Sequence, residues 1–415
     1  MHIAWLGKKS PFCGNVTYGR EITKVLLSRK HQVSFLHFAE GKSNYHHNSQ
    51  SPEVLLPFLY KSQVYTIPTF KASKVFMRSL EKLKPDLVHA SLTLSPLDFL
   101  LPDICEEMNL PLVATFHPPF DSKIRNLKSS TQYLTYQLYA PFLARYDRTI
   151  VFSDIQRDLL LKLGVPPHKV VVIPNGVDEQ KYSPGYSNFK YQLGAKSLFV
   201  YQGRIATEKN VEALLKAWKH CQMGNGCKLL IVGDGPLRAS LQLQYGKEEN
   251  VIWLGFVAEE ERRIDILRAA DVFILPSLVE GLSISLLEAM ACGVACIATD
   301  AGADGEVLNK SAGIVIDTQG VAAQLKTLLP LFSQQPEMAM LLGNKARQRV
   351  LERYTLSQNI TKLEQLYTKI ALRQPMKSSI AKDLASHKQK LEDFSEIPVS
   401  ESNIPQDLSA PSQEF

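Results

Sequence analysis

Short apolar runs alternate with helix-like segments along most of this chain, and this alternation limits the possible folds more than any other feature. The runs are short enough to be buried strands, and each helix-like segment is long enough to cross back over a sheet, so that successive strands run parallel. We predict strands over Ile3–Leu6, Val33–Phe38, Leu87–Ala90, Leu112–Phe116, Thr149–Phe152 and Val170–Ile173, and then over Leu198–Tyr201, Leu229–Val232, Val251–Leu254, Val272–Leu275, Ala295–Ala298 and Gly313–Ile316. The pattern predicts an α/β protein with two doubly wound, Rossmann-like domains that face each other across a cleft.

The pattern is interrupted at Ser183-Pro184-Gly185, which is followed by a polar stretch to Lys196. We place the domain boundary there. The first domain then covers residues 1–183, the second covers residues 197–355, and a final helical segment occupies residues 356–373. Residues 376–415 are rich in Ser, Lys, Glu, Pro and Gln and poor in aromatic residues, so we expect a disordered tail.

Composition narrows the possible environments and partners. No apolar stretch is long enough to span a membrane, the N-terminus does not resemble a secretory signal, and the six cysteines show no zinc-ligand spacing. These observations favour a reduced, cytosolic environment. The net charge of +6 is concentrated in residues 1–190, while the remainder is slightly acidic. The basic half predicts an anionic partner, either a membrane surface or a phosphorylated ligand, and the absence of a nucleic-acid-binding motif argues against nucleic acid.

Two glutamates eight positions apart, Glu280 and Glu288, lie between the strand Val272–Leu275 and a helix-like run that ends near Gly293. This places two carboxylates and a helix N-terminus at the carboxyl end of a strand, where open α/β sheets bind ligands. The helix N-terminus attracts phosphate, and a carboxylate just inside it can hold sugar hydroxyls. A structural alternative is a capping box, because Ser285-x-x-Glu288 has the required spacing.

Two loops in the second domain are candidate phosphate sites. Arg204 and Lys209 follow a strand, five positions apart, and can both reach one diphosphate; the alternative is a pair of solvated loop cations. Gly233 and Gly235, in Gly-Asp-Gly-Pro, follow the next strand and permit close approach of the backbone to a ligand, although an ordinary tight turn explains them equally well.

The first domain offers two further candidates. Gly14 lies in the loop after the first strand and marks a point where the backbone can approach phosphate, unless it is only a turn glycine. His117 closes the strand Leu112–Phe116, where it could bond a sugar hydroxyl or the acceptor; a satisfied loop histidine is the alternative.

Basic residues with helical spacing could hold the protein at an anionic bilayer, or they could form a solvated face. The first group is Lys71, Lys74, Arg78 and Lys82, and the second is Lys123, Arg125 and Lys128. Aromatic residues follow the second group, at Tyr133, Tyr136, Tyr139 and Phe142. Aromatic rings beside cations suit a membrane interface, and a packed helix is the competing interpretation.

A metal site is not expected. Metal-held nucleotide sugars usually need a paired acid, and no Asp-x-Asp occurs in the chain. Its absence favours neutralisation of a diphosphate by Arg, Lys and a helix dipole, without cofactor or metal.

Together these segments resemble glycosyltransferase family 4, retaining enzymes of the GT-B fold. The resemblance runs from Met1 to about Ile370. It rests on Gly14-Asn-Val-Thr-Tyr-Gly-Arg-Glu21, Thr115-Phe-His117, Val172-Ile-Pro-Asn-Gly-Val-Asp178, Gly203-Arg204 with Glu208-Lys209, Gly233-Asp-Gly-Pro236 and the Glu280–Glu288 pair.

The resemblance implies a role for each matching residue. Arg204 and Lys209 would bind the diphosphate of the donor and stabilise it as it leaves. Glu288 would hold the ribose hydroxyls, and Glu280 would contact the sugar. The other implied donor contacts are Gly14 near the diphosphate, His117 near the transferred sugar, backbone N–H groups of Gly281, Leu282 and Ser283, and the backbone of Val257 at the base. The segment 356–373 would cross back onto the first domain.

The acceptor is inferred from further likeness. Pro11-Phe-Cys-Gly-Asn-Val-Thr-Tyr18 and Ala90-Ser-Leu-Thr-Leu-Ser-Pro-Leu-Asp98 are similar to segments of glycosyltransferases from cyanobacteria and plastids. Among these, a digalactosyldiacylglycerol synthase is the leading expectation: galactose would pass from UDP-galactose to monogalactosyldiacylglycerol, with the enzyme peripherally bound to the membrane. Three alternatives stay open: a soluble transferase acting on a small sugar or polysaccharide, a nucleotide-sugar epimerase of the same fold, and a non-catalytic sugar-nucleotide sensor.

Overall fold

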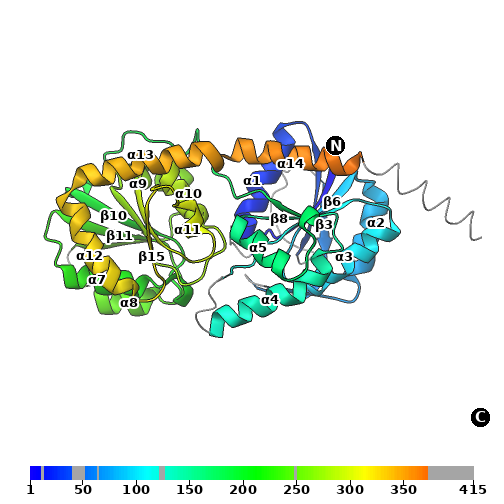
Figure 1. Ribbon diagram of the computed structural model, residues 1–415, viewed down its shortest axis with the longest axis horizontal. Helices are drawn as coiled ribbons and strands as arrows, with labels where there is room; N and C mark the ends of the chain where they lie inside the picture. Colours follow the sequence, from blue (N-terminus) through cyan, green and yellow to red (C-terminus); the bar gives the residue numbers. More distant parts are fainter. Residues whose placement is uncertain (11–13, 40–51, 63–64, 121–126, 247–249, 373–415) are drawn as a thin grey trace, which may run out of the picture. The chain divides into compact units, whose positions relative to one another are not determined.

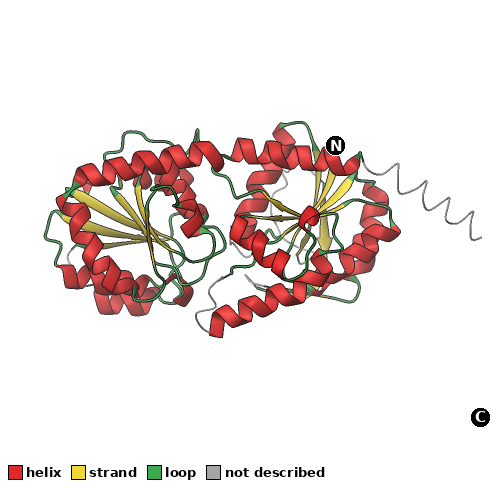
Figure 2. Cartoon of the chain, viewed as in Figure 1, coloured by secondary structure: helices red, strands yellow, loops and turns green. Residues whose placement is uncertain are grey.

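The computed structural model describes residues 1–10, 14–39, 52–62, 65–120, 127–246 and 250–372. Residues Met1–Thr368 form one compact unit that contains two parallel sheets, each covered by helices on both faces (Figures 1 and 2). The expected tail falls outside the described residues.

The first sheet has seven parallel strands in the order β3-β2-β1-β6-β7-β8-β9. Its inner strands are almost entirely buried on both faces, which explains why they read in the sequence as continuous apolar runs. The strands are β1 (His2–Leu6), β2 (Gln32–Phe38), β3 (Glu53–Leu56), β6 (Leu87–Ser91), β7 (Leu112–Thr115), β8 (Arg148–Val151) and β9 (Val170–Val172).

The second sheet has six parallel strands in the order β12-β11-β10-β13-β14-β15. They are β10 (Ser197–Gln202), β11 (Cys227–Val232), β12 (Val251–Gly255), β13 (Val272–Leu275), β14 (Ala295–Thr299) and β15 (Ile314–Ile316). Two doubly wound parallel sheets are the fold class that the alternating pattern predicts.

The helices lie between the strands along the chain, in the segments with helical spacing of apolar residues. In the first half they are α1 (Gly14–Ser28), α2 (Ala72–Leu83), α3 (Pro96–Glu107), α4 (Leu127–Leu143) and α5 (Asp154–Lys162). In the second half they are α6 (Phe189–Gln192), α7 (Val211–Cys221), α8 (Arg238–Tyr245), α9 (Glu260–Ala269), α10 (Ile284–Ala291), α11 (Asp304–Val307), α12 (Val321–Gln334), α13 (Pro336–Arg353) and α14 (Leu356–Ala371).

Three strands were not predicted. Besides β3, a separate antiparallel hairpin consists of β4 (Phe58–Lys61) and β5 (Thr66–Pro68). All three are short, and Pro57 and Pro68 interrupt their apolar pattern, so neither length nor alternation gives a clear strand signal.

The last helix contacts the first sheet and its helices. Arg29, directly after α1, pairs with Glu364 of α14 at 2.6 Å, and the Tyr367 hydroxyl bonds the buried ring of His89 in β6 at 2.5 Å. Figure 1 shows α14 beside α1. The chain therefore passes between the two sheets twice. The two passages are joined where Val177 N–H donates to the Tyr354 carbonyl and Leu356 N–H donates to the Val177 carbonyl, both at 2.9 Å.

Candidate active site

In each sheet the strand order reverses between two central strands, β1 and β6 in the first and β10 and β13 in the second. Ligands of open α/β sheets bind outside the carboxyl ends of the strands at such a reversal. Most of the predicted site residues lie in the loops that follow these strands or their neighbours. We call residues 203–209, after β10, the cation loop, and residues 277–283, after β13, the acid loop.

Lys209 of the cation loop and Glu280 of the acid loop form an ion pair. The Lys209 Nζ lies 2.5 Å from the Glu280 Oε1, which also accepts a hydrogen bond from the Ser277 hydroxyl at 2.7 Å. The Glu280 side chain is only 9% exposed, so the two charges face each other with little water between them. The structure thus brings together two of the predicted catalytic residues that are far apart in the chain.

Two main-chain contacts of the acid loop fix its position. Leu278 N–H donates to the Glu208 carbonyl of the cation loop at 2.7 Å. Phe120 N–H, from the loop after β7, donates to the Glu280 carbonyl at 3.3 Å. The acid loop is therefore hydrogen-bonded both to its neighbour in the second sheet and to a loop of the first sheet.

Helix α10 starts from the end of the acid loop, and its N-cap is Ser283. The Ser283 hydroxyl accepts from Leu286 N–H, while Ser285 lies within the helix. The capping-box alternative for Glu288 is therefore wrong, because the residue three positions before it does not cap the helix. Glu288 lies in the body of α10, where it has no part in starting the helix.

Burial raises the pKa of Glu288 to about 7, against partial compensation by a hydrogen bond from Tyr182. The amide Nε2 of Gln202, at the end of β10, donates to Glu288 Oε2 at 3.1 Å. A carboxylate that is largely removed from water is stabilised in its charged form by hydrogen-bond donors. Two vicinal hydroxyl groups of a ribose would meet that demand.

Asp304 is a site residue that the sequence analysis missed. It begins the short helix α11 after β14 and is fully buried. Its Oδ1 accepts the Ser283 N–H at 2.9 Å, while its Oδ2 has no hydrogen-bond partner among the described residues. Burial, followed by the charge of Glu280, raises the pKa of Asp304 well above its ordinary value. A lone aspartate in Ala-Gly-Ala-Asp-Gly reads as a turn, and only the position of β14 beside β13 brings it to the site.

The Asp304 contact corrects one expectation about the acid loop. Ser283 N–H was expected to face the ligand, but it is already engaged by Asp304. The N–H groups of Gly281 and Leu282 have no hydrogen-bond partner within the described ranges, so they are the ones available to a ligand.

The cation loop packs directly against Gly233 and Gly235. Gly233 has a positive φ of 136°, and a Cβ there would lie 1.9 Å from the Gly203 carbonyl oxygen; at Gly235 it would lie 2.3 Å from the Ile205 carbonyl oxygen. Both glycines are thus required by the contact between two loops, whether or not a ligand also approaches them. The Arg204 side chain is exposed and ion-paired with Glu208.

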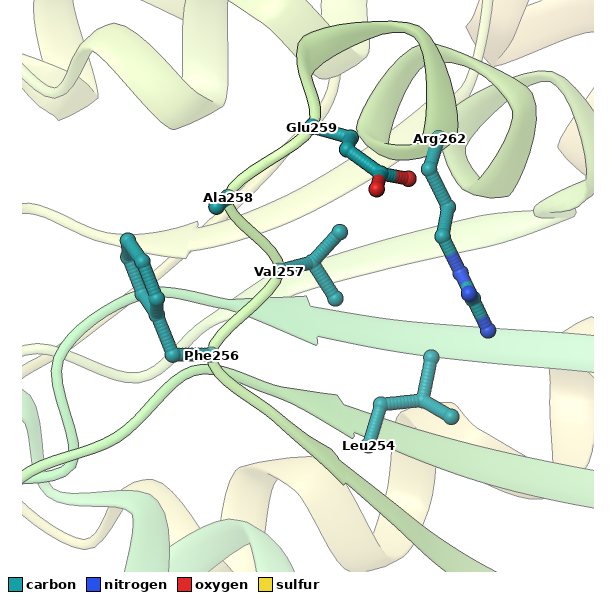
Figure 3. Close-up of a pocket in the computed structure, with 6 residues that line it drawn as sticks. All are labelled: Leu254, Phe256, Val257, Ala258, Glu259 and Arg262. Carbon is teal, nitrogen blue, oxygen red and sulfur yellow. The ribbon is translucent and has the colours of Figure 1, made fainter.

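A cavity of about 310 Å³ lies after β12 and is lined by Leu254, Phe256, Val257, Ala258, Glu259 and Arg262. In Figure 3 the Val257 side chain extends toward Glu259 and Arg262, and the Phe256 ring turns to the other side of the loop. The carbonyls of Val257 and Ala258 accept hydrogen bonds from Arg263 at 3.1 and 2.8 Å. The predicted base site therefore coincides with a recess whose backbone is held in place.

His117, in the loop after β7, belongs to a chain of neutral hydrogen bonds. Its Nε2 lies 2.7 Å from the Ser91 hydroxyl, which donates to Asn15 Oδ1 at 2.9 Å. Because the single hydroxyl proton of Ser91 goes to Asn15, Ser91 must accept from His117, and the His117 proton sits on Nε2. Burial lowers the pKa of His117 to about 3. The ring is neutral, and its Nδ1 is left as an acceptor.

The glycines at positions 14 and 281 differ in their surroundings. Gly14 is exposed at the N-terminus of α1 and has open space around its Cα. The His117 carbonyl lies 3.4 Å from where a Cβ on Gly281 would be, so the acid loop and the His117 loop are neighbours.

The basic residues of α2 are all exposed: Lys71, Lys74, Arg78 and Lys82. Lys123 and Arg125 lie outside the described residues; Lys128 lies in α4, and its side chain is not among those described. The aromatic run of α4 is largely internal, because Tyr136 and Tyr139 are buried and bond Pro118 and Asp98. The membrane interpretation of these two rings is wrong, and they belong to a packed helix.

Neither a metal-ligand cluster nor a membrane-spanning helix occurs among the described residues. No group of three or more His, Cys, Asp or Glu side chains there could hold a metal ion. Within the same ranges, no helix combines the length and apolarity needed to cross a bilayer.

Comparison with known proteins identifies the family. The model for glycosyltransferase family 4 matches residues 14–181, and that for glycosyl transferases group 1 matches residues 188–349. The UDP-Gal:alpha-D-GlcNAc-diphosphoundecaprenol alpha-1,3-galactosyltransferase of Escherichia coli is 28% identical over 69% of this chain and 76% of its own length. The alpha-monoglucosyldiacylglycerol synthase of Streptococcus pneumoniae is 29% identical over 55% of each chain.

A solved structure gives the same answer for the fold. Anabaena HepE in complex with UDP-glucose superposes with a TM-score of 0.71 at 18% identity and covers 89% of this chain and all of its own. The strand order of the two sheets and the family matches therefore point to the same fold. The chain belongs to glycosyltransferase family 4 and has the GT-B fold, and it is an enzyme that transfers a sugar from a nucleotide sugar.

Proposed function

We propose that this enzyme moves a hexose from a UDP-sugar to a hydroxyl of a membrane glycolipid, with retention of the anomeric configuration. In its most specific form the reaction is transfer of galactose to monogalactosyldiacylglycerol. The observation that carries the catalytic part is the buried Lys209–Glu280 pair beside the N-terminus of α10.

The diphosphate would bind between the cation loop and the start of α10. Breaking the anomeric bond places negative charge on the leaving diphosphate, and fixed cations and N–H groups stabilise that charge as it develops. Lys209 would exchange Glu280 for the diphosphate, Arg204 would leave Glu208 to supply a second cation, and Gly281 and Leu282 would add N–H donors.

Glu280 and Glu288 would grip the two sugars of the donor. Once Lys209 turns to the phosphates, Glu280 is free to accept from hydroxyls of the hexose. Glu288, in the body of helix α10, would accept from the ribose, and the recess at Val257 would hold the base. With a diphosphate between them, the two carboxylates thus serve the two ends of one molecule.

His117 would face the transferred hexose from the first domain. A neutral ring with an acceptor at Nδ1 can take a hydrogen bond from a sugar hydroxyl without adding a positive charge beside the oxocarbenium-like carbon. The acceptor hydroxyl would then attack on the face that the diphosphate leaves, which preserves the anomeric configuration.

Two relatives support a lipid-linked acceptor and a uridine donor. The Escherichia coli enzyme is named for UDP-Gal and a diphosphoundecaprenol acceptor, and the Streptococcus pneumoniae enzyme for a glucosyldiacylglycerol product. The exposed cations of α2 are compatible with work at an anionic surface. Peripheral membrane association in the cytoplasm or stroma follows as part of the proposal.

The test is release of nucleoside diphosphate from UDP- and GDP-sugars, each with and without monogalactosyldiacylglycerol, monoglucosyldiacylglycerol, a polyprenyl-diphosphate sugar and a soluble disaccharide. We expect release from a UDP-sugar only with a lipid acceptor, and galactose with the galactolipid as the best pair. Turnover with the disaccharide alone would overturn the lipid acceptor, and conversion of the donor without any acceptor would indicate an epimerase. Because amines and N–H groups would hold the diphosphate, EDTA should leave the rate unchanged.

A further inference from the structure

The hairpin β4–β5 and the residues just after it expose several large apolar side chains. Phe70, directly after it, is 99% exposed, and Leu59 is 69% exposed. Tyr60, Tyr65 and Ile67 are also among the exposed large apolar residues. Several large apolar side chains exposed on one short hairpin indicate an interaction surface. We call these five side chains, Leu59, Tyr60, Tyr65, Ile67 and Phe70, the hairpin surface.

Strand pairing, a ring contact and a main-chain hydrogen bond hold part of the hairpin surface in place. Tyr60 and Ile67 are directly paired across the two strands, and the rings of Tyr60 and Tyr65 lie 5.5 Å apart. Thr66 N–H donates to the Leu94 carbonyl at 3.4 Å, which attaches the hairpin to the domain while the neighbouring Ile67 points outward. The exposed side is thus supported from behind.

Cations without acidic partners begin where the hairpin ends. Lys71 and Lys74 open helix α2, three residues after β5, and Arg78 and Lys82 follow on the same helix. None of the four forms an ion pair with any residue that the structure describes. By contrast, the exposed Arg145, also in the first half of the chain, is paired with Asp103.

We propose that the hairpin surface, together with Lys71 and Lys74, docks on an anionic lipid bilayer. Tyrosine and phenylalanine rings would enter the boundary between headgroups and acyl chains, and the two lysines would meet lipid phosphates. A second copy of the chain fits less well, because a two-fold contact would bring the uncompensated lysines toward one another. The inference deepens the proposed function, since a bilayer is where a glycolipid acceptor lies, but it can be measured without turnover.

The experiment uses the full chain with Phe70→Trp and vesicles of phosphatidylcholine, with and without phosphatidylglycerol. We expect a blue shift of the added tryptophan and quenching by brominated acyl chains on anionic vesicles only. The shift should fall as salt rises, because the lysine contribution is screened. Tyr191→Trp is the matched control: its site is 88% exposed on α6, which precedes the second sheet in the chain, and its emission should not respond.

Two further variants divide the surface into its parts. Leu59→Ser with Phe70→Ser should weaken vesicle binding by about tenfold or more, since it removes two apolar side chains from the interface. Lys71→Glu with Lys74→Glu should remove the preference for anionic over neutral vesicles. Circular dichroism of each variant should match the parent chain.

The outcomes separate this inference from the proposed function. No shift and no quenching of the Phe70→Trp emission on any vesicle would overturn the docking surface, whatever the enzyme transfers. A change of the Leu59→Ser, Phe70→Ser variant from dimer to monomer, with vesicle binding intact, would overturn it too and assign the surface to self-association. Vesicle binding through the hairpin together with turnover of soluble acceptors only would keep the surface and reject the glycolipid acceptor.

Discussion

The two halves of the candidate site handle charge in opposite ways. Around α10 in the second domain, Lys209 is paired with Glu280 and Arg204 with Glu208, so that formal charges lie close together. Around His117 in the first domain, a neutral ring, a hydroxyl and an amide form the hydrogen-bonded chain. The difference indicates where the proposed reaction would generate charge: ion-paired side chains would face the leaving group, and the neutral His117 chain, with the buried Lys8 near it, would face the hydroxyl groups.

The largest effect should come from the charged half. Lys209→Ala removes a cation that would stabilise the leaving diphosphate, and kcat/KM should fall by about 10²–10³ at unchanged fold. The matched control is Lys216→Ala, which removes an exposed lysine paired with Glu212 on α7. Steady-state kinetics of both variants test the comparison, and equal rates for the two would end the assignment of Lys209.

Glu288→Gln should separate binding from stability. The pKa of Glu288 is raised from 4.5 to about 7 in the folded protein. The folded state therefore holds this proton more tightly than the unfolded state, and the stability it contributes is complete below pH 4.5 and lost as pH rises through 7. The ionised form costs up to about 3 kcal/mol at pH 8.

Glu288→Gln should accordingly raise the melting temperature at pH 8 and leave it almost unchanged at pH 4.5. It should also weaken UDP binding by about tenfold or more, because a charged acceptor for the ribose is lost. Calorimetry at the two pH values and a titration with UDP measure both effects. An unchanged UDP affinity would place the ribose elsewhere.

Substitutions at Asp304 test whether its protonated, uncharged form is the working one. Burial and the charge of Glu280 raise the Asp304 pKa well above its ordinary value and so favour the protonated form, and Asp304→Asn should therefore keep most of the activity. Asp304→Ala removes the acceptor of the Ser283 N–H and should lower kcat/KM by about tenfold, since one buried N–H is left unpaired. If the Asn variant were as impaired as the Ala variant at pH 7, the ionised carboxylate would be the working form.

The smallest effect should come from the neutral half. Ser91→Ala frees the His117 ring to turn and to move its proton, and KM for the donor should rise by about threefold to tenfold with little change in kcat. Ser91→Thr, which keeps the hydroxyl, is the control. Ser91→Ala should leave the shape of the pH–rate profile unchanged around pH 6.5, because the His117 pKa of about 3 keeps the ring neutral there and a change near pH 7 would come from Glu288 in both enzymes.

The sequence allowed the two sheets to be predicted because buried parallel strands are continuous apolar runs, and β1, β10 and β13 are examples. It located the cation and acid loops because Arg204, Lys209 and Glu280 follow such runs. The Lys209–Glu280 pairing depends on β10 lying beside β13. The order of strands in a sheet cannot be read from the local sequence pattern.

The missed features have equally local causes. Asp304 carries no distinguishing neighbours, and its importance comes from burial beneath Ser283. The capping-box spacing at Ser285 was correct as a pattern, but Ser283, two residues earlier, provides the cap. The aromatic run of α4 was ambiguous because a ring that packs inside and a ring that meets a membrane have the same helical spacing.

The contact between Gly203 and Gly233 has a consequence for which ligands the site can accept. Gly203 N–H bonds the Val232 carbonyl at 3.0 Å, and Gly233 N–H bonds the Gly255 carbonyl at 2.7 Å, so three successive loops are joined through main-chain atoms alone. The distance from the recess at Val257 to the cation loop is thereby set largely by the backbone, and the Arg263 side chain holds the Val257 and Ala258 carbonyls in place. For the proposed donor, substitutions would alter which base or hexose is preferred more readily than the permitted length of the molecule between them.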